Sequence, residues 1–290
     1  MKAKKYCFDG SKKCILSDLP TGSKHDKVKK DAILEKFHDN LKTLDELQNR
    51  FYADGKEGLI VVLQALDAAG KDSLIRHVAT GMNPQGVSVS CFKRPNTEEL
   101  AHDYLWRVNK VLPKRGEIAI FNRSYYEDVI TAAVLNLKDT YDMAPRVTGV
   151  SEKKFIDERM KQVMHYERYL YENSYRIVKV FLHISKEEQK KRFLERIERP
   201  DKNWKFEPAD LETRKKFDDY MDTFERVITK TATREAPWYV LPADDKWYTR
   251  YLFSEVLIDT ISKTKPEYPT LPEDVRSQLS EYKKELENEK

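Results

Sequence analysis

Apolar positions follow two different spacings along this chain. Between Asp31 and Phe51, leucine and phenylalanine recur at every third or fourth residue, which predicts an amphipathic helix that Gly55 closes. The continuous apolar run Gly58–Gln64 predicts a strand that is buried on both faces. Further strands are predicted at 87–92, 117–121, 177–184 and 238–241, and helices at 71–80 and 98–111. Strands that alternate with helices predict a doubly wound α/β fold with a parallel sheet.

The same pattern divides the chain into three parts. Residues 1–30 are polar and rich in lysine, and we expect them to pack loosely as an extended arm. Residues 31–262 contain the predicted α/β domain. Residues 263–290 are rich in proline and glutamate, and we expect a tail that is partly mobile or wraps a neighbour.

Small residues follow the first predicted strand, in the run Gln64-Ala-Leu-Asp-Ala-Ala-Gly-Lys-Asp-Ser73, and a predicted helix comes next. Small residues let backbone N–H groups surround phosphate oxygens, and a helix start adds favourable partial charge. The run departs from the usual phosphate-loop pattern, which has glycine at Ala65 and a hydroxyl at Asp72. The residues that we expect to bind phosphate are Ala68, Ala69, Gly70, Lys71, Asp72 and Ser73.

A carboxylate, Asp67, lies inside this loop. Beside phosphates, a carboxylate is useful for holding Mg²⁺ or for accepting a hydrogen bond from the incoming nucleophile. The alternative is a tight strand-to-helix turn in which Asp67 only caps the helix.

Polar residues also follow the strand predicted at 117–121. Asn122 ends it, Arg123 comes next, and Glu127 and Asp128 lie a few residues further on. Because ligands bind at the carboxyl ends of parallel strands, Arg123 is a candidate for neutralising a transferred phosphoryl group. Glu127 and Asp128 could recognise the acceptor or hold metal through water. The alternatives are a structural salt bridge for Arg123 and ordinary surface polarity for the two carboxylates.

Five sequence blocks in order make the chain resemble the second family of polyphosphate kinases, over roughly Asp31–Ile261. They are Val-Leu-Gln-Ala-Leu-Asp67-Ala-Ala-Gly-Lys-Asp, Asn83-Pro-x-Gly-Val, Asp103-Tyr-Leu-Trp-Arg, Phe121-Asn-Arg-Ser-x-Tyr-Glu-Asp and Ala236-Pro-Trp-Tyr-Val. The resemblance implies a phosphate-loop kinase fold similar to thymidylate kinase, with a parallel sheet between helices and a helical lid. It also implies reversible, Mg²⁺-dependent transfer of phosphoryl groups between inorganic polyphosphate and nucleotides.

The resemblance also implies roles for individual residues. Asp67 is similar to the family's catalytic loop aspartate and is the expected Mg²⁺ ligand, while Lys71 and Arg123 are similar to its two catalytic cations. Asn122 stands where many members have aspartate, which shifts the metal-binding role to Asp67. The Asn-Arg-Ser and Tyr-Glu-Asp sequences resemble a branch that accepts nucleoside monophosphates as well as diphosphates, AMP and ADP among them. Asn122, Glu127 and Asp128 would then contact the nucleotide.

A polyphosphate path requires lysine and arginine. Lys93 and Arg94 follow the second predicted strand, and Arg107 comes from the next helical stretch; an ordinary solvated surface is the alternative for each. Residues 185–216 mix dense charge of both signs, which is typical of a mobile lid or of an exposed helix with internal ion pairs. Ser185 followed by Glu188 predicts a helix start. Within this lid, the candidates for phosphate contact are Lys191, Arg192 and Arg196.

Composition narrows the remaining choices. The 53 Lys and Arg residues against 49 Asp and Glu leave a net charge of +4, which argues against nucleic acid as a partner. Apolar runs are too short for a membrane span, no secretory signal is expected, and the three scattered cysteines fit a cytoplasmic protein with reduced thiols. Homo-oligomers are common in this fold class, and we expect one. An ATP-dependent nucleotide kinase and a catalytically silent nucleotide- or polyanion-binding protein remain as alternatives.

Overall fold

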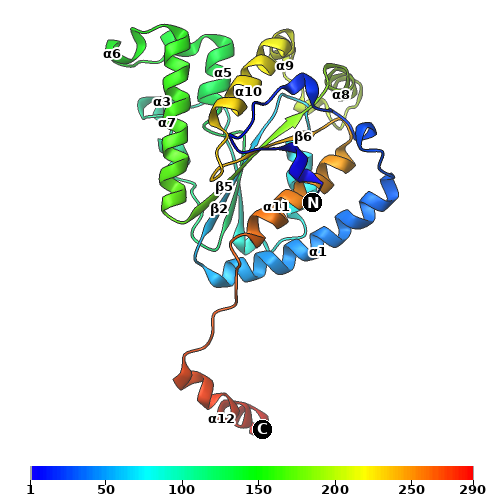
Figure 1. Cartoon of the computed structure of the whole chain (residues 1–290), viewed down its shortest axis with the longest axis vertical. Coiled ribbons are helices and arrows are strands. Elements are labelled where there is room, and N and C mark those ends of the chain that lie inside the picture. Colours follow the sequence, from blue (N-terminus) through cyan, green and yellow to red (C-terminus); the bar gives the residue numbers. More distant parts are fainter. Residues whose placement is uncertain (1, 290) are drawn as a thin grey trace.

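A six-stranded sheet forms the centre of the molecule in the computed structural model, which describes residues 2–289 (Figure 1). Its strand order is β1-β6-β5-β2-β4-β3, and the strands from β2 to β6 run parallel. Their bounds are β2 Gly58–Gln64, β3 Val87–Cys91, β4 Ile118–Asn122, β5 Tyr175–His183 and β6 Trp238–Pro242. The predicted parallel sheet is therefore confirmed.

The chain order reverses at β2, which places the loop after β2 at the switch point of the sheet. From β2 the chain goes to the outer strand β3, returns to β4, and then crosses to β5 on the other side of β2. Leu63 pairs in register with Asn122, and Gln64 pairs with Phe181. The carboxyl ends of β2, β4 and β5 consequently lie together, where α/β sheets bind their ligands.

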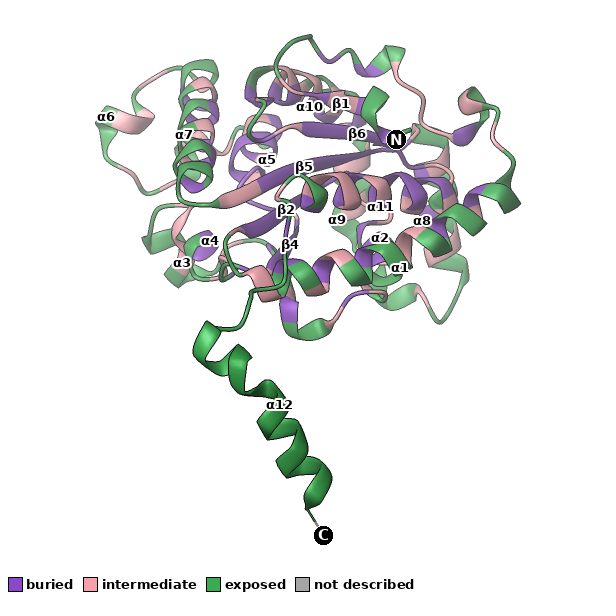
Figure 2. Cartoon of the chain, turned by 60° about the horizontal axis from the view of Figure 1, so that its bottom comes forward, coloured by how far each residue is buried: buried purple, intermediate pink, exposed green. Residues whose placement is uncertain are grey.

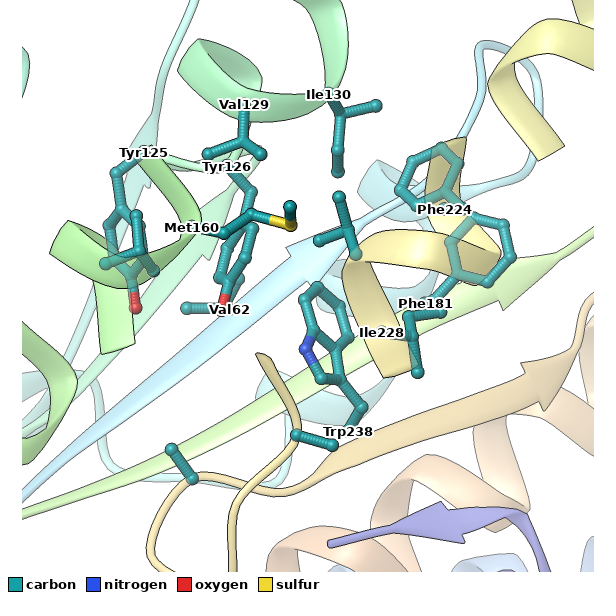
Figure 3. Packing of buried hydrophobic residues seen from close by; sticks show 14 of the residues in the cluster. Val62, Tyr125, Tyr126, Val129, Ile130, Met160, Phe181, Phe224, Ile228 and Trp238 are labelled. Atoms are coloured by element: carbon teal, nitrogen blue, oxygen red, sulfur yellow. The ribbon is translucent and has the colours of Figure 1, made fainter. Parts of the chain in front are cut away.

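Helices cover both faces of the sheet. One face packs against α5 (Glu127–Leu135), α7 (Glu152–Glu172) and α10 (Phe217–Thr231). The other face packs against α1 (Lys30–Asp54), α2 (Lys71–Ala79) and α11 (Lys246–Ser262). Because side chains alternate along a strand, Ile60 and Val62 of β2 enter the first core, whereas Leu59, Val61 and Leu63 enter the second. Figure 3 shows Val62, Phe181 and Trp238 of the first core packed beneath the helices.

The N-terminal segment is packed more closely than the sequence predicts. Its short strand β1 (Cys7–Phe8) pairs antiparallel with β6, and Tyr6, Phe8 and Leu16 are buried. The prediction of a loosely packed arm was wrong. The apolar residues of this segment show no regular spacing, yet they are buried beside the edge of the sheet. Three 3₁₀ helices complete the segment: Ala3–Tyr6, Leu16–Asp18 and Ser23–Asp26.

Two other segments differ from their expected form. The helical stretch at 98–111 consists of two short helices, α3 (Thr97–Ala101) and α4 (Trp106–Asn109). The tail contains a helix, α12 (Glu273–Asn288), which is exposed along its length and extends away from the body of the molecule (Figures 1 and 2). The remaining short helices are Pro84–Gly86, Leu137–Thr140 and α6 (Pro145–Thr148).

The predicted lid segment is helical. It comprises α8 (Lys186–Glu198), a 3₁₀ turn at Asn203–Lys205, and α9 (Pro208–Lys215). The Ser185 hydroxyl oxygen accepts a hydrogen bond from the Glu188 backbone N–H at 3.1 Å, which confirms the predicted helix start. Within residues 2–289, every helix is too short or too polar to cross a membrane.

Candidate active site

The loop after β2 curls around the side chain of Lys71, the first residue of α2. Positive φ angles of 63° at Ala68 and 107° at Gly70 give the loop its sharp turns. The buried Lys71 Nζ donates to the backbone oxygens of Ala65 at 2.8 Å and Leu66 at 3.3 Å. Burial, followed by the positive charge of Arg123, lowers the pKa of Lys71 to about 8.

Arg123 reaches the same loop from the end of β4. Its backbone N–H donates to the Leu63 oxygen at 3.0 Å, and its φ of 63° places it in the left-handed region. The guanidinium Nη2 lies 2.6 Å from Asp67 Oδ1, and Nη1 lies 3.7 Å from Glu127 Oε2. Desolvation opposes its charge, but Glu127 and Asp67 raise the pKa of Arg123 above its usual range. The aspartate, the lysine and the arginine named from the sequence thus gather at one edge of the sheet.

Asp72 and Asn122 form a second polar pair beside Lys71. Asn122 Nδ2 donates to Asp72 Oδ1 at 2.8 Å, and Lys205 Nζ lies 3.5 Å from Asp72 Oδ2. Desolvation acts against the charge of Asp72, but the Asn122 amide and the Lys205 charge lower its pKa overall. Asn122 therefore acts as a hydrogen-bond donor to a carboxylate in this structure.

Arg192 contacts the phosphate loop in a way that the sequence did not predict. Its buried guanidinium donates to four backbone oxygens, those of Ala68, Ala69, Ala243 and Asp244, at 2.7–3.1 Å. These contacts differ from the expected binding of phosphate by a mobile arginine. The guanidinium instead holds the loop against the turn after β6, because carbonyl groups already take up its donors.

Gln189 is a contact that sequence reasoning missed. Its Nε2 donates to the Asp67 backbone oxygen at 3.1 Å, and its Oε1 accepts from Arg214 Nη1 of α9 at 2.9 Å. One buried amide therefore connects α8 and α9 to the loop residue Asp67. A glutamine within a densely charged segment gives no local signal of such a role.

Arg196 and Lys191 are the other candidates from the lid. Arg196 Nη1 lies 3.2 Å from Asp210 Oδ2, which ties α8 to α9. Lys191 is exposed and lies 3.8 Å from Glu188. In this arrangement neither side chain forms a hydrogen bond or ion pair with residues 64–73, so their phosphate contacts remain predictions that depend on lid movement.

A basic hollow of about 340 Å³ lies at the end of β3. Lys93, Arg94 and Arg107 line it together with Cys91 and Glu99. Arg107 Nη1 donates to the Lys93 backbone oxygen at 2.8 Å, which fixes the turn that carries Lys93 and Arg94. The structure thus brings together the three basic residues named from the sequence in this region.

Glu127 and Asp128 point to different surroundings. Glu127 contacts Arg123, whereas buried Asp128 accepts from the Tyr141 hydroxyl at 3.2 Å and lies 3.9 Å from Arg107. Burial raises the pKa of Asp128, and nearby guanidinium groups oppose this shift only in part. Asp128 therefore lies beside the basic hollow, and Glu127 lies beside Arg123.

The residues present fit a Mg²⁺ ion that arrives with phosphate. Within residues 2–289, no group of three or more His, Cys, Asp or Glu side chains forms a ready metal site. Mg²⁺ commonly takes one or two carboxylates and completes its coordination with water and substrate phosphates. Asp67 and Asp72 flank the predicted phosphate loop and supply carboxylates of this kind.

A lysine at the start of a helix, a curled loop and an arginine at the carboxyl edge of a parallel sheet define a phosphate-loop kinase fold. The model of the family described as Polyphosphate kinase 2 (PPK2) matches residues 27–269 of the chain. The chain belongs to this family, which confirms the resemblance.

Named relatives and a solved structure agree with this placement. The chain is 43% identical over 256 residues to the ADP-polyphosphate phosphotransferase of Rhodopseudomonas palustris, across 87% of this chain and 88% of that protein. It is 42% identical over 240 residues to the AMP/ADP-polyphosphate phosphotransferase of Meiothermus ruber, across 83% and 85%. The crystal structure of Polyphosphate Kinase 2 from Arthrobacter aurescens TC1 superposes with a TM-score of 0.77 at 36% identity, covering 86% of this chain and 84% of that one.

Proposed function

We propose that this protein is a phosphotransferase that moves phosphoryl groups from inorganic polyphosphate to AMP and ADP, with guanine nucleotides as further acceptors. The reaction is reversible and depends on Mg²⁺. The observation that carries this proposal is the meeting of Asp67, Lys71 and Arg123 at the switch point, where Arg123 lies 2.6 Å from Asp67. Relatives named as polyphosphate phosphotransferases support the choice of donor.

Lys71 binds the terminal phosphates of the donor in this mechanism. Its ammonium exchanges the backbone oxygens of Ala65 and Leu66 for phosphate oxygens, which are stronger acceptors because they are charged. Backbone N–H groups at the start of α2 add donors to the same oxygens. The loop therefore holds the donor with its terminal phosphorus exposed toward Arg123.

Transfer then requires one bond to break and one to form. A terminal phosphate oxygen of the acceptor nucleotide attacks the terminal phosphorus of the chain, and the bridging oxygen leaves with the shortened chain. Arg123 offsets charge on the phosphoryl group in flight, while Asp67 orients the attacking oxygen. Mg²⁺, held by Asp67 with Asp72 nearby, would supply further neutralisation of the phosphate oxygens. No covalent intermediate on the protein is needed.

The helices of 185–216 close over the reacting groups as a lid. Gln189 connects Asp67 to Arg214, so movement of α9 is transmitted to the catalytic loop through two hydrogen bonds. Closure excludes water, which would otherwise compete with the nucleotide as acceptor. Arg196 and Lys191 are placed on the elements that move.

The acceptor occupies the side of Arg123 nearest to Glu127 and Asn122. Lys93, Arg94 and Arg107 contribute positive charge at the adjoining hollow, with Asp128 behind them. We further propose a cytoplasmic homo-oligomer. The location is supported by Cys7, Cys14 and Cys91, which form no disulfide in the structure.

Two other functions make different predictions. An ATP-dependent nucleotide kinase would need a hydroxyl after Lys71 in the usual loop, and the chain has Asp72 there. A catalytically silent binding protein would not require an aspartate that forms an ion pair with Arg123. Assays with AMP, ADP and GDP, each with polyphosphate and with ATP as alternative donors, separate the three functions by their products.

The decisive variant is Asp67→Asn, with ATP formation from ADP and polyphosphate as the readout. We expect a loss of about two to three decades in kcat, the usual cost of one lost charge contact in a transition state. Asp274→Asn on the exposed helix α12 is the matched control and should keep full activity. Wild-type turnover in folded Asp67→Asn protein would reject the proposal.

A further inference from the structure

The N-terminal end of α11 lies beside the phosphate loop, on the side away from β4. Lys246 and Arg250 of α11 line a hollow together with Ala69, Gly70 and Ser73 at the start of α2. Helix α11 begins directly after β6, so it stands at the same carboxyl edge of the sheet as the catalytic residues. Lys246 and Arg250 play no part in the mechanism given above.

These two cations lack the carboxylate partners that nearby basic residues have. Lys202 pairs with Glu195, Lys205 with Asp72 and Arg196 with Asp210. Within residues 2–289, no carboxylate oxygen lies within 4 Å of a Lys246 or Arg250 side-chain nitrogen. The hollow is therefore locally positive beside a loop that is itself built to receive anions.

One hydrogen bond holds the Arg250 guanidinium in place, but another of its N–H groups has no acceptor. Its Nη2 donates to Ser73 Oγ at 3.0 Å, which points the guanidinium at the first turn of α2. Its Nε is buried and has no hydrogen-bond partner in the described chain. A buried N–H group without an acceptor costs free energy, and an incoming oxygen at this place would recover it.

The acidic residues near Lys246 form hydrogen bonds or ion pairs with other groups. Asp244 Oδ1 accepts from the Ser185 backbone N–H at 2.8 Å, and Asp245 Oδ2 accepts from the backbone N–H of Ser23 at 2.8 Å. Glu188 is engaged by Arg192 at 2.8 Å. Desolvation, followed by the charge of Arg192, lowers the pKa of Lys246. The charges of Glu195 and Glu188 oppose this shift only in part, and neither carboxylate forms an ion pair with Lys246.

We propose that Lys246, Arg250 and Ser73 bind a phosphate group of the donor chain, one or more units beyond the phosphate that is transferred. This inference rests on the proposed function, because it assumes a donor whose terminal phosphates engage Lys71. Ser73 is two residues past Lys71 on the first turn of α2, so a chain leaving Lys71 along Gly70 meets Ser73 and Arg250 next. The hollow has no aromatic lining residue on which a nucleobase could stack. The hollow has an accessible volume of about 10 Å³, so it admits a single phosphate oxygen while the rest of the chain lies outside it.

The test uses the double variant Lys246→Ala/Arg250→Ala in the full-length protein. KM is measured for long-chain polyphosphate, for tripolyphosphate and for ADP. We expect the KM for the long chain to rise at least about fivefold, which is typical of losing two partly exposed charge contacts. The kcat and the KM for ADP should stay within about twofold of wild type, because the transferred phosphate and the acceptor do not use this subsite. The KM for tripolyphosphate should rise no more than that for the long chain, because only its second and third phosphates can reach the subsite.

Three further variants keep the result interpretable. Arg276→Ala/Lys284→Ala on exposed α12 removes the same charge far from the loop and should leave every KM unchanged. Arg250→Lys retains the charge and should retain most of the affinity for the long chain. Lys246→Ala alone leaves the hydrogen bond between Arg250 and Ser73 intact and should raise that KM about twofold.

Two results would overturn the inference. The first is an unchanged KM for long-chain polyphosphate in the double variant relative to the α12 control. The second is a rise in the KM for ADP instead, which would assign the cations to the phosphates of the nucleotide. If wild-type protein transfers no phosphoryl group, the proposed function fails, but calorimetric titration with long-chain polyphosphate still tests the subsite. Equal affinities of wild type and double variant in that titration would likewise overturn it.

Discussion

Lys71 and Lys179 are both buried, but the groups that surround them differ. Lys179, in the middle of β5, donates to Glu167 Oε2 at 2.6 Å, to the Thr231 backbone oxygen at 2.8 Å and to the Tyr126 hydroxyl at 3.1 Å. Lys71 donates to two backbone oxygens, and no carboxylate of residues 2–289 lies within 4 Å of its Nζ. Burial is the leading cause of a lowered pKa in both. The comparison separates a buried charge that is neutralised by a carboxylate from one that has only backbone oxygens as partners.

The ion pair between Lys179 and Glu167 also supports the candidate active site indirectly, through the residues that follow Arg123. Tyr125 and Tyr126 donate to Glu167 Oε1 at 2.9 Å and 3.0 Å, and they follow Arg123 by two and three residues. Figure 3 shows Tyr126 beside Trp238, whose ring lies 4.9 Å from it. The network around Glu167 therefore anchors the residues just after Arg123 to α7 and to the sheet.

Replacing Lys179 should have the largest effect. Lys179→Met leaves the Glu167 carboxylate buried without its cation, and we expect the free energy of unfolding to fall by about 3–5 kcal/mol in urea denaturation. The double variant Lys179→Met/Glu167→Leu removes both charges and should recover much of this loss. A single variant that loses less than about 1 kcal/mol would contradict the view that the pair holds the fold together.

Replacing Lys71 should affect catalysis and leave stability almost unchanged. For Lys71→Met we expect kcat for ATP formation to fall by about two to three decades, or about 3–4 kcal/mol in activation free energy. The free energy of unfolding should change by no more than about 1 kcal/mol, since the loss of two hydrogen bonds is offset by removing a desolvated cation. If Lys71→Met lowers the free energy of unfolding as much as Lys179→Met does, the proposed difference between the two lysines is wrong.

The pKa of Lys71, about 8 in the free protein, gives a pH test of the same contrast. As pH rises through 8, the ammonium loses its proton, and affinity for polyphosphate should fall by up to about tenfold per pH unit. Between this value and the ordinary lysine pKa, the unfolded chain binds more protons than the folded one. The free energy of unfolding should therefore rise with pH in that window.

Calorimetric titration with polyphosphate at pH 7, 8 and 9 measures the first effect, and urea denaturation at the same pH values measures the second. Lys71→Met should bind weakly at every pH and should lose the pH dependence of stability that Lys71 contributes. If the affinity of the wild type for polyphosphate does not change between pH 7 and 9, Lys71 does not lose a proton in this range or does not bind the phosphate chain.

The smallest effect is expected at the outer part of the Lys179 network. Tyr125→Phe removes one of the hydrogen bonds to Glu167 and should lower the free energy of unfolding by about 0.5–1.5 kcal/mol. Catalytic rate should stay within about twofold of wild type, because Tyr126 still anchors the segment. A large loss of kcat without loss of stability would instead show that Tyr125 positions Arg123.

Sequence patterns predicted the parts of the molecule that depend on neighbouring residues. Strand-like runs, continuous and apolar at 58–64, located β2 to β6, and a Gly-Lys pair after the first of them indicated the position of the phosphate loop. The approach of Arg123 to Asp67 was also predictable, because polar ends of adjacent parallel strands meet at one edge. These features follow from local pattern and from sheet topology.

Contacts between distant parts of the chain could not be predicted in this way. Gln189 and Asp67 are 122 positions apart, and Arg250 and Ser73 are 177 apart. Arg192 lies at the predicted site, but its guanidinium donates to backbone oxygens of residues far apart in the sequence, and no local pattern predicts those partners. A charged residue such as Lys179 within an apolar strand gives no sign of which carboxylate will meet it.

The left-handed backbone at Arg123 affects how variants of this protein should be screened. Glycine adopts this conformation without the steric penalty that a side chain incurs, so Arg123→Gly relieves local strain while deleting the guanidinium. Heat or protease selection would pass such a substitution, because both respond only to the folded population. A library selected only for stability could thus become enriched in proteins that lack the Arg123 guanidinium, and a turnover assay is needed to detect the loss that the proposed mechanism predicts.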